Sequence, residues 1–87
     1  MTIRYEFVKR TVAGESFLVP VGEAAKKFNG LFALNELAAF IWDRLPEVAD
    51  DAALVDAVLE AYDVTRETAE ADTAEFLGVL RSMGIID

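Results

Sequence analysis

The chain has 87 residues, of which 54% are hydrophobic, and a formal net charge of −8. A chain of this length buries one core and no more, and its apolar content is that of a folding domain rather than a disordered tail. No apolar run approaches the roughly 20 residues that cross a bilayer, and the first residues lack the pattern of a secretory signal. We therefore expect a single cytoplasmic domain over residues 1–87.

The residue types that carry most enzyme chemistry are missing. The sequence contains no Cys and no His, which removes thiolate nucleophiles, zinc–sulfur sites and the commonest general base. Its five glycines form no phosphate-binding pattern. Catalysis would rest on carboxylates alone, in a chain too short to enclose a pair of them. We expect a protein that is not an enzyme and that uses no cofactor and no metal.

Charge is distributed unevenly along the chain. Residues 1–34 carry five basic and three acidic side chains, whereas residues 35–87 carry three basic and thirteen acidic ones. Binding to a phosphate backbone is driven by counterion release from clustered Lys and Arg, so this balance argues against a nucleic acid as partner. The acidic half is either a solvated helical surface that keeps the protein soluble or a face that steers a basic peptide or partner enzyme.

The first third of the chain predicts three short strands. Residues 3–8 begin with alternating apolar and charged side chains, as a half-buried strand does. Residues 13–15 form a turn signal, and residues 16–21 follow as a second strand. Residues 22–27 then connect to a third strand at about residues 28–34. A sheet this small is not stable alone, so it must pack against helices.

Three helices are predicted in the remainder, and the first two are marked by caps and breakers. Asn35 is a good N-cap for the first helix, and Pro46 disfavours helical geometry at the residue before it. The dense apolar residues of this helix make it the most buried one, with Trp42 as a core anchor. The second helix begins near Asp50 and carries an apolar stripe over residues 54–62.

The third helix follows the cap Thr65 and ends before Gly84, a left-handed stop. After it, Ile85–Ile86 is expected to fold back as an apolar clasp. Strands at residues 3–34 and helices at residues 36–83 predict an α+β fold, in which a three-stranded antiparallel sheet is followed by three helices in a layout close to a winged helix.

The segment Phe28–Trp42 resembles the signature of the PqqD-like family. In that family a short strand ends in Leu-Asn and opens a helix that carries an Ile-Trp or similar apolar pair; here these are Leu34-Asn35 and Ile41-Trp42. Residues 72–85 match the D-x-x-x-F-L-x-x-L-x-x-x-G-I ending of the family. The resemblance is close from residue 28 onward and covers the earlier part of the chain by layout alone.

The resemblance implies function by binding. PqqD-like proteins, also called recognition elements of ribosomally synthesised and post-translationally modified peptides (RiPPs), hold the leader segment of a precursor peptide. They present the rest of that peptide to a modifying enzyme, often a radical S-adenosylmethionine (SAM) enzyme. The family's leader docks beside the third strand, in a groove lined by the third helix. The implied partners are thus a precursor peptide and a separate enzyme, and the chain would act as a free-standing peptide chaperone in natural product biosynthesis.

The residues give this binding mode a physical basis. If the third strand is an edge, its free N–H and C=O groups can accept another strand. Gly30 leaves room for an approaching backbone, and the apolar residues after it offer a floor. Asp72 and Glu75 can make charge-assisted hydrogen bonds to a leader Lys or Arg. The candidate peptide-binding residues are Gly30, Leu31, Phe32, Ala33, Leu34, Asp72, Glu75, Phe76 and Val79.

Each of these residues can also have a purely structural role. The large apolar side chains can be core, because a domain this small needs them there; Gly30 can mark a β-bulge, and Asp72 can simply solvate its helix. A winged-helix nucleic-acid binder fits the element order, although its recognition helix would carry Arg66 and Arg81 against four acidic residues. An adaptor or a homodimer could use the same strand edge.

Overall fold

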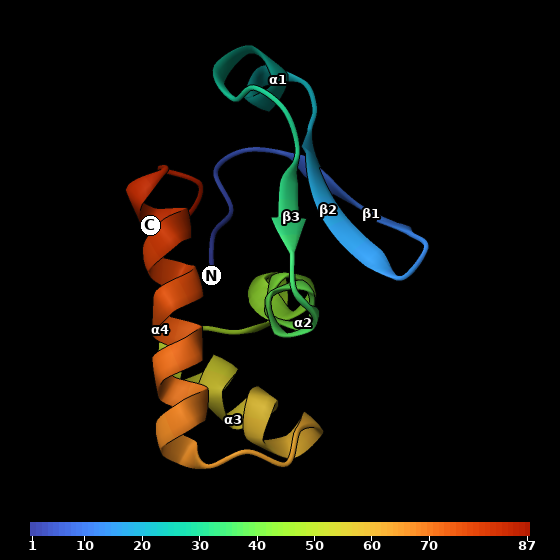
Figure 1. Cartoon of the computed structure of the whole chain (residues 1–87). Coiled ribbons are helices and arrows are strands. Elements are labelled where there is room, and N and C mark those ends of the chain that lie inside the picture. The colour runs from blue at the N-terminus through green and yellow to red at the C-terminus, as the bar shows by residue number, and fades with distance from the viewer.

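The computed structural model, which describes residues 1–87, places a three-stranded sheet beside a group of helices (Figure 1). Along the chain the elements are β1 (Phe7–Val12), β2 (Glu15–Pro20), α1 (Glu23–Lys27), β3 (Phe32–Leu34), α2 (Glu36–Arg44), a 3-10 turn (Leu45–Glu47), α3 (Asp51–Ala61) and α4 (Arg66–Ser82). The predicted α+β class, with a sheet that precedes the main helices, is confirmed. None of the helices combines the length and the hydrophobicity needed to cross a bilayer.

The sheet is antiparallel with the strand order β1-β2-β3, so β1 and β3 are its two edges. A two-residue turn joins β1 to β2. Its residues, Ala13 and Gly14, have φ angles of 52° and 81°, and two successive positive values are what a type I′ hairpin turn requires. β3 is much shorter and pairs with Ser16–Leu18 of β2 only.

The first strand begins later than the sequence pattern indicated. Side chains of residues 3–6 do alternate between half-buried and exposed, but this segment lies outside the sheet, and β1 starts only at Phe7. Ile3 instead forms an isolated bridge with Ile86, and the N–H of Arg4 donates to the carbonyl of Ile85 at 2.7 Å. The alternation is therefore produced by packing against the core, while the hydrogen bonds go to the C-terminal clasp.

The connection from β2 to β3 also differs from the prediction. A short helix, α1, occupies most of residues 22–27, where only a connection was expected. β3 occupies only the last three residues of the predicted strand at residues 28–34. Phe28 ends α1, and its ring packs against the rings of Tyr5 and Phe7, with centroids 5.3 and 5.5 Å away. Aromatic packing has replaced strand pairing in this part of the chain.

The predicted beginnings of the three main helices are confirmed by their caps. The side chains of Asn35, Asp50 and Thr65 each accept a hydrogen bond from the backbone N–H three residues further on, as N-caps do. At the other end of α4, Gly84 has a φ of 74°, the left-handed conformation that glycine adopts without strain. Ile85–Ile86 is buried, so the predicted clasp is present.

One hydrophobic core lies between the sheet and the helices. Trp42 is 7% exposed and belongs to this core, as predicted. Its ring lies edge-on to Phe7 at 5.8 Å, and Phe7 lies at the same distance from Phe32 of β3. These edge-to-face contacts attach the short third strand to the core. The twelve buried core residues are Leu18, Ile41, Trp42, Leu45, Leu54, Val55, Val58, Ala69, Leu77, Leu80, Ile85 and Ile86.

Candidate functional site

β3 is paired with β2 on one side only, and α4 lies beyond its other side (Figure 1). A cavity of about 400 Å³ opens between β3 and α4, and eleven of its twelve lining residues are hydrophobic. Leu31 and Val79 stand on its two walls and are 59% and 51% exposed. The lining residues are Leu18, Leu31, Phe32, Ala33, Leu34, Asn35, Ala38, Phe76, Val79, Leu80, Met83 and Ile85.

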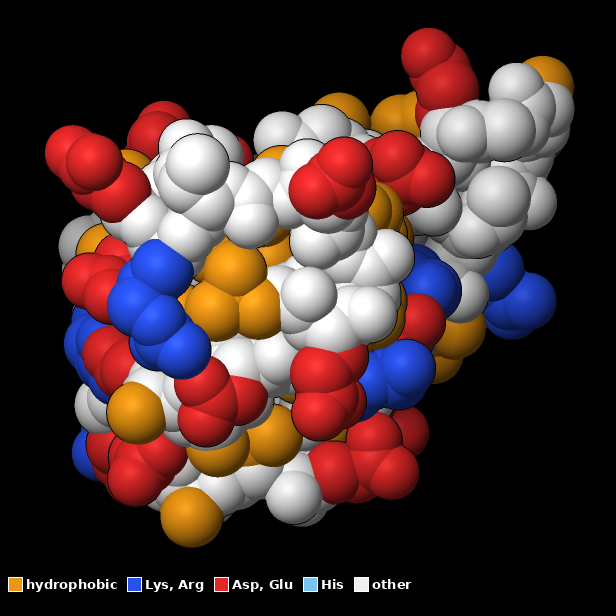
Figure 2. Space-filling model, turned by 90° about the horizontal axis from the view of Figure 1, so that it is seen from below, with side chains coloured by type: hydrophobic (Ala, Val, Ile, Leu, Met, Phe, Trp, Pro, Cys, Tyr) orange, Lys and Arg blue, Asp and Glu red, His pale blue; other side chains and the backbone are white.

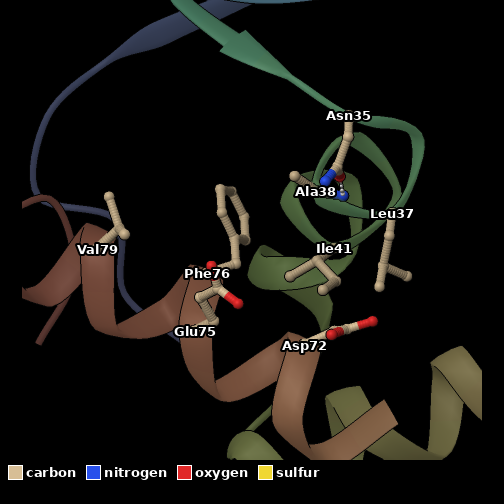
Figure 3. Close-up of a pocket in the computed structure, with 8 residues that line it drawn as sticks. All are labelled: Asn35, Leu37, Ala38, Ile41, Asp72, Glu75, Phe76 and Val79. Atoms are coloured by element: carbon tan, nitrogen blue, oxygen red, sulfur yellow. Dashed lines mark hydrogen bonds between the residues drawn. The ribbon is translucent and has the colours of Figure 1, made fainter. Parts of the chain in front are cut away.

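A second cavity of about 280 Å³ lies between α2 and the middle of α4. Figure 3 shows the side chain of Phe76 rising from α4 toward the end of β3, and the carboxylate of Asp72 extending toward Leu37 on α2. The lining residues are Asn35, Leu37, Ala38, Ile41, Asp72, Glu75, Phe76 and Val79.

The two cavities form one groove, because Asn35, Ala38, Phe76 and Val79 line both of them. We call this continuous surface the β3–α4 groove. β3 and α4 run in opposite directions along it (Figure 1). One end of the groove therefore contains the start of β3 and the end of α4 and is apolar, whereas the other end contains Asp72 and Glu75.

The acidic end of the groove has no cation to balance it. The two arginines of α4 point elsewhere: Arg66 pairs with Asp56 at 3.3 Å and Arg81 with Asp51 at 2.7 Å, both on α3. The hydrogen bond to Asp51 raises the pKa of Arg81, which agrees with the pairing of this guanidinium on α3. Asp72 and Glu75 form no ion pair, and neither cavity is lined by Lys or Arg.

Acidic side chains also predominate outside the groove. Figure 2 looks at the end of the molecule where α3 and the beginning of α4 lie, and carboxylates are spread across that face with few basic side chains among them. The strongly acidic second half of the sequence is thus displayed on the helices, while much of the basic charge lies on β1 and α1.

Eight of the nine predicted site residues line the groove. Leu31 to Leu34 line the larger cavity, Asp72 and Glu75 the smaller one, and Phe76 and Val79 both. Gly30 lines neither cavity. It lies in the bend before β3 with a φ of 78°, so it is neither a strand residue nor a bulge, and its lack of a side chain serves the bend.

Core and groove share the large apolar residues. Leu77 and Leu80 are buried, as expected of core residues. Phe32, Leu34 and Phe76 are half-buried, pack against the core with one side and line the groove with the other. The core role and the binding role therefore do not exclude each other, because one layer of side chains forms both the edge of the core and the floor of the groove.

Sequence reasoning missed the α2 wall of the groove. Leu37, Ala38 and Ile41 lie on one face of α2, which their i, i+1, i+4 spacing could have shown. The spacing indicates which residues share a face of α2, but it does not indicate that this face lies opposite α4. Asn35 was predicted only as a cap; its side chain accepts the N–H of Ala38 at 2.8 Å while the residue also lines both cavities. Met83 was placed in the third helix and Ile85 in the clasp, but neither was predicted at the site.

A family model described as coenzyme PQQ synthesis protein D (PqqD) matches residues 15–86. The chain belongs to the PqqD family. No curated protein matches it. Among solved structures, this PqqD-family chain is similar to TbiB1 in complex with the TbiA(beta) leader peptide, with 26% identity and a TM-score of 0.73 over 100% of this chain and 95% of that one.

A second solved structure has the same fold. It is a lasso peptide synthetase B1 complexed with the leader peptide, which is 24% identical with a TM-score of 0.70 over 97% of this chain and 93% of that one. The resemblance seen in the sequence from residue 28 onward is therefore confirmed as family membership and extends over nearly the whole chain as a shared fold.

Proposed function

We propose that this PqqD-family protein binds the leader segment of a ribosomally synthesised precursor peptide and presents it to a separate modifying enzyme. The observation that carries the proposal is the β3–α4 groove, where a free strand edge lies against an apolar cavity with an acidic end. Two solved structures with this fold are leader-peptide complexes, which supports a peptide as the ligand.

The free edge of β3 explains how an extended peptide would be held. A strand that adds to β3 satisfies the outward N–H and C=O groups that β2 leaves unpaired. Alternate side chains of an added strand point to the same side, so every second residue of the leader would enter the cavity beside Phe76 and Val79. Main-chain bonds then supply sequence-independent affinity, and the cavities supply selectivity.

Such a protein contributes by tethering rather than by catalysis. A leader held in the groove raises the effective concentration of the attached core peptide at a bound enzyme, without any new chemistry. Two versions of the proposal differ in the enzyme served: a radical SAM enzyme, which the family resemblance implies, or a lasso peptide synthetase, which the name of the second solved structure suggests. Co-purification with each class of enzyme distinguishes these two versions. We place the step in the cytoplasm, where ribosomes supply the precursor.

Binding of nucleic acid is the competing function of a winged-helix layout. A recognition helix needs free cations toward the phosphates. In α4, however, Arg66 and Arg81 are both paired with α3, and the carboxylates of Asp72 and Glu75 face the open groove. We expect no retention on duplex DNA at low salt, and retention there would favour this alternative.

The proposal is tested by titrating the ¹⁵N-labelled chain with the leader of a precursor peptide encoded beside it. Amide shifts should concentrate at residues 31–35 and 72–83, with little change in the β1–β2 turn. Shifts confined to that turn, or no binding by any such leader, would overturn the proposal. Sedimentation of the free chain, with and without the leader, shows whether a second copy occupies the same edge.

A further inference from the structure

We propose that the β3–α4 groove selects leaders by two side chains in a fixed order: a Lys or Arg held by Asp72 and Glu75, followed two or four residues later by a large apolar residue in the larger cavity. The inference rests on the proposed function and deepens it by naming the class of peptide sequence that the groove accepts. It uses the acidic end and the apolar end as two separate subsites.

The apolar subsite is defined by size and by exposed surface. The cavity of about 400 Å³ has space for a large aliphatic or aromatic side chain. Four large hydrophobic residues of the chain are exposed, and two of them, Leu31 and Val79, stand on opposite walls of this cavity. An apolar side chain placed between them would remove both from water, which stabilises binding by roughly 25 cal/mol for each Å² buried.

The acidic subsite is suited to a long basic side chain rather than to a metal ion. Asp72 and Glu75 lie one turn apart on α4, and the wall opposite them is formed by Leu37 and Ile41. No group of three or more Asp, Glu, His or Cys side chains that could hold a metal is present. Lys and Arg carry an aliphatic stem with a charged head. The stem can pack along the apolar wall while the head donates charge-assisted hydrogen bonds to the two carboxylates.

The order of the two side chains follows from the direction of the sheet. Both existing strand pairs are antiparallel, and a strand added antiparallel to β3 continues the more stable pattern. Such a strand enters beside Asn35 at the acidic end and leaves beside Leu31 at the apolar end. The basic residue therefore precedes the apolar one in the leader.

The spacing follows from the geometry of α4 and of the added strand. Asp72 and Val79 lie seven positions apart on α4, which corresponds to a rise of about 10 Å along the helix axis. A strand covers about 7 Å for every two residues, and residues two or four apart face the same side. A separation of two or four residues therefore places both side chains in the groove.

The test is selection of a displayed library of random 12-residue peptides on three forms of the full chain: wild type, D72N/E75Q and the control E60Q/E70Q. Glu60 and Glu70 are exposed, form no ion pair and line neither cavity, so the control has the same change in charge. Wild-type selections should be enriched in Lys or Arg two or four residues before Leu, Ile, Phe, Tyr or Trp. D72N/E75Q should lose the basic preference but keep the apolar one.

For a selected peptide, affinity should fall roughly tenfold or more in D72N/E75Q, the effect of losing hydrogen bonds to a charged group, and should stay within about twofold in the control. No basic enrichment, the reverse order, or an equal loss in both variants would overturn the two-subsite inference. Selected peptides whose binding is unaffected by V79E would instead show that the groove is not the site, which overturns the proposed function itself. Thermal melts of each variant establish that it is folded.

Discussion

The two edges of the sheet are exposed in different ways. β1 has six residues, and its sequence includes Lys9 and Arg10; the Nζ of Lys9 lies 2.5 Å from a carboxylate oxygen of Asp43 on α2. β3 has three residues with no charged side chain and borders the larger cavity. Charged residues on an edge strand, Lys above all, oppose the addition of another strand, so β1 is the protected edge and β3 the open one.

The difference suggests how a small domain can expose a strand edge while limiting unspecific strand pairing. A long, flat, apolar edge would pair with any extended chain. β3 offers only three residues, and α4 stands close beside it with Val79 and Phe76 toward the groove. If a leader adds to β3 as proposed, it must fit the cavities as well as the backbone, and we expect selectivity to come from that combination.

The largest expected effect comes from placing a charge in the groove. Val79→Glu should weaken leader binding by roughly thirtyfold or more, because a carboxylate would be buried against the bound peptide without a partner. Val79 is 51% exposed in the free chain, so folding should be little affected. Val12→Glu introduces the same charge on β1, where the residue is 64% exposed, and should change affinity by less than about twofold. Calorimetric titration measures the leader affinity of both variants. Equal losses of affinity would show that the two edges do not differ in peptide binding.

The next largest effect is expected in amide hydrogen exchange, which should slow at β3 but not at β1. When the leader binds, the outward amides of residues 31–35 should exchange roughly tenfold more slowly or better, because exchange then requires the added strand to open. Amides of β1, residues 7–12, should not change. Mass spectrometry of the free and bound chain measures the exchange of both segments. Protection of β1 would show that the peptide adds to β1 rather than to β3.

A smaller effect is expected at the junction of β3 with α2. Asn35→Ala should lower the free energy of unfolding by about 1 kcal/mol through loss of the N-cap, and should also weaken leader binding, because Asn35 lines both cavities. Asp50→Ala removes the equivalent cap of α3, away from the groove. Denaturant unfolding should give similar stability losses for the two variants, with a loss of leader affinity for N35A alone. N35D should retain the cap.

The last and smallest of the expected effects concerns the charged residues of the β1 edge. The variant K9T/R10T loses the ion pair of Lys9 with Asp43, which is partly exposed and contributes at most about 1 kcal/mol. Its β1 edge would no longer carry charge, so the variant should self-associate with rising concentration while the wild type does not. Sedimentation velocity over a range of concentrations detects this. A monomeric variant would show that the charges of β1 are not what protects that edge.

Features with a local physical cause were predictable from the sequence. The caps Asn35, Asp50 and Thr65 and the stop at Gly84 depend on short-range hydrogen bonds and backbone conformation, and each is present. Residues on both sides of the groove were also predicted. The family resemblance pointed to the third strand and the third helix, and the spacing of residues indicated which of them lie on the strand edge and on the helix flank. Their role in binding stays a prediction.

Features that depend on distant partners were not predictable in this way. The alternation at residues 3–6 is the same whether its hydrogen bonds go to a sheet or to Ile85. Phe28 has the β-propensity of a strand residue, yet its ring packs against Tyr5. The α2 wall of the groove appears only when Leu37 is placed opposite Asp72 by the packing of α2 on α4. In each case tertiary contacts choose between local alternatives of similar energy.

The aromatic contacts behind β3 have an optical consequence. Trp42 is the only tryptophan of the chain. Its indole packs against the ring of Phe7, which in turn packs against the ring of Phe32, and Phe32 lines the larger cavity. Indole emission depends on the packing around the ring. A ligand that shifts Phe32 should therefore change the fluorescence of Trp42, although Trp42 lies outside the groove. We therefore expect Trp42 to report, without any added label, whether the groove is occupied.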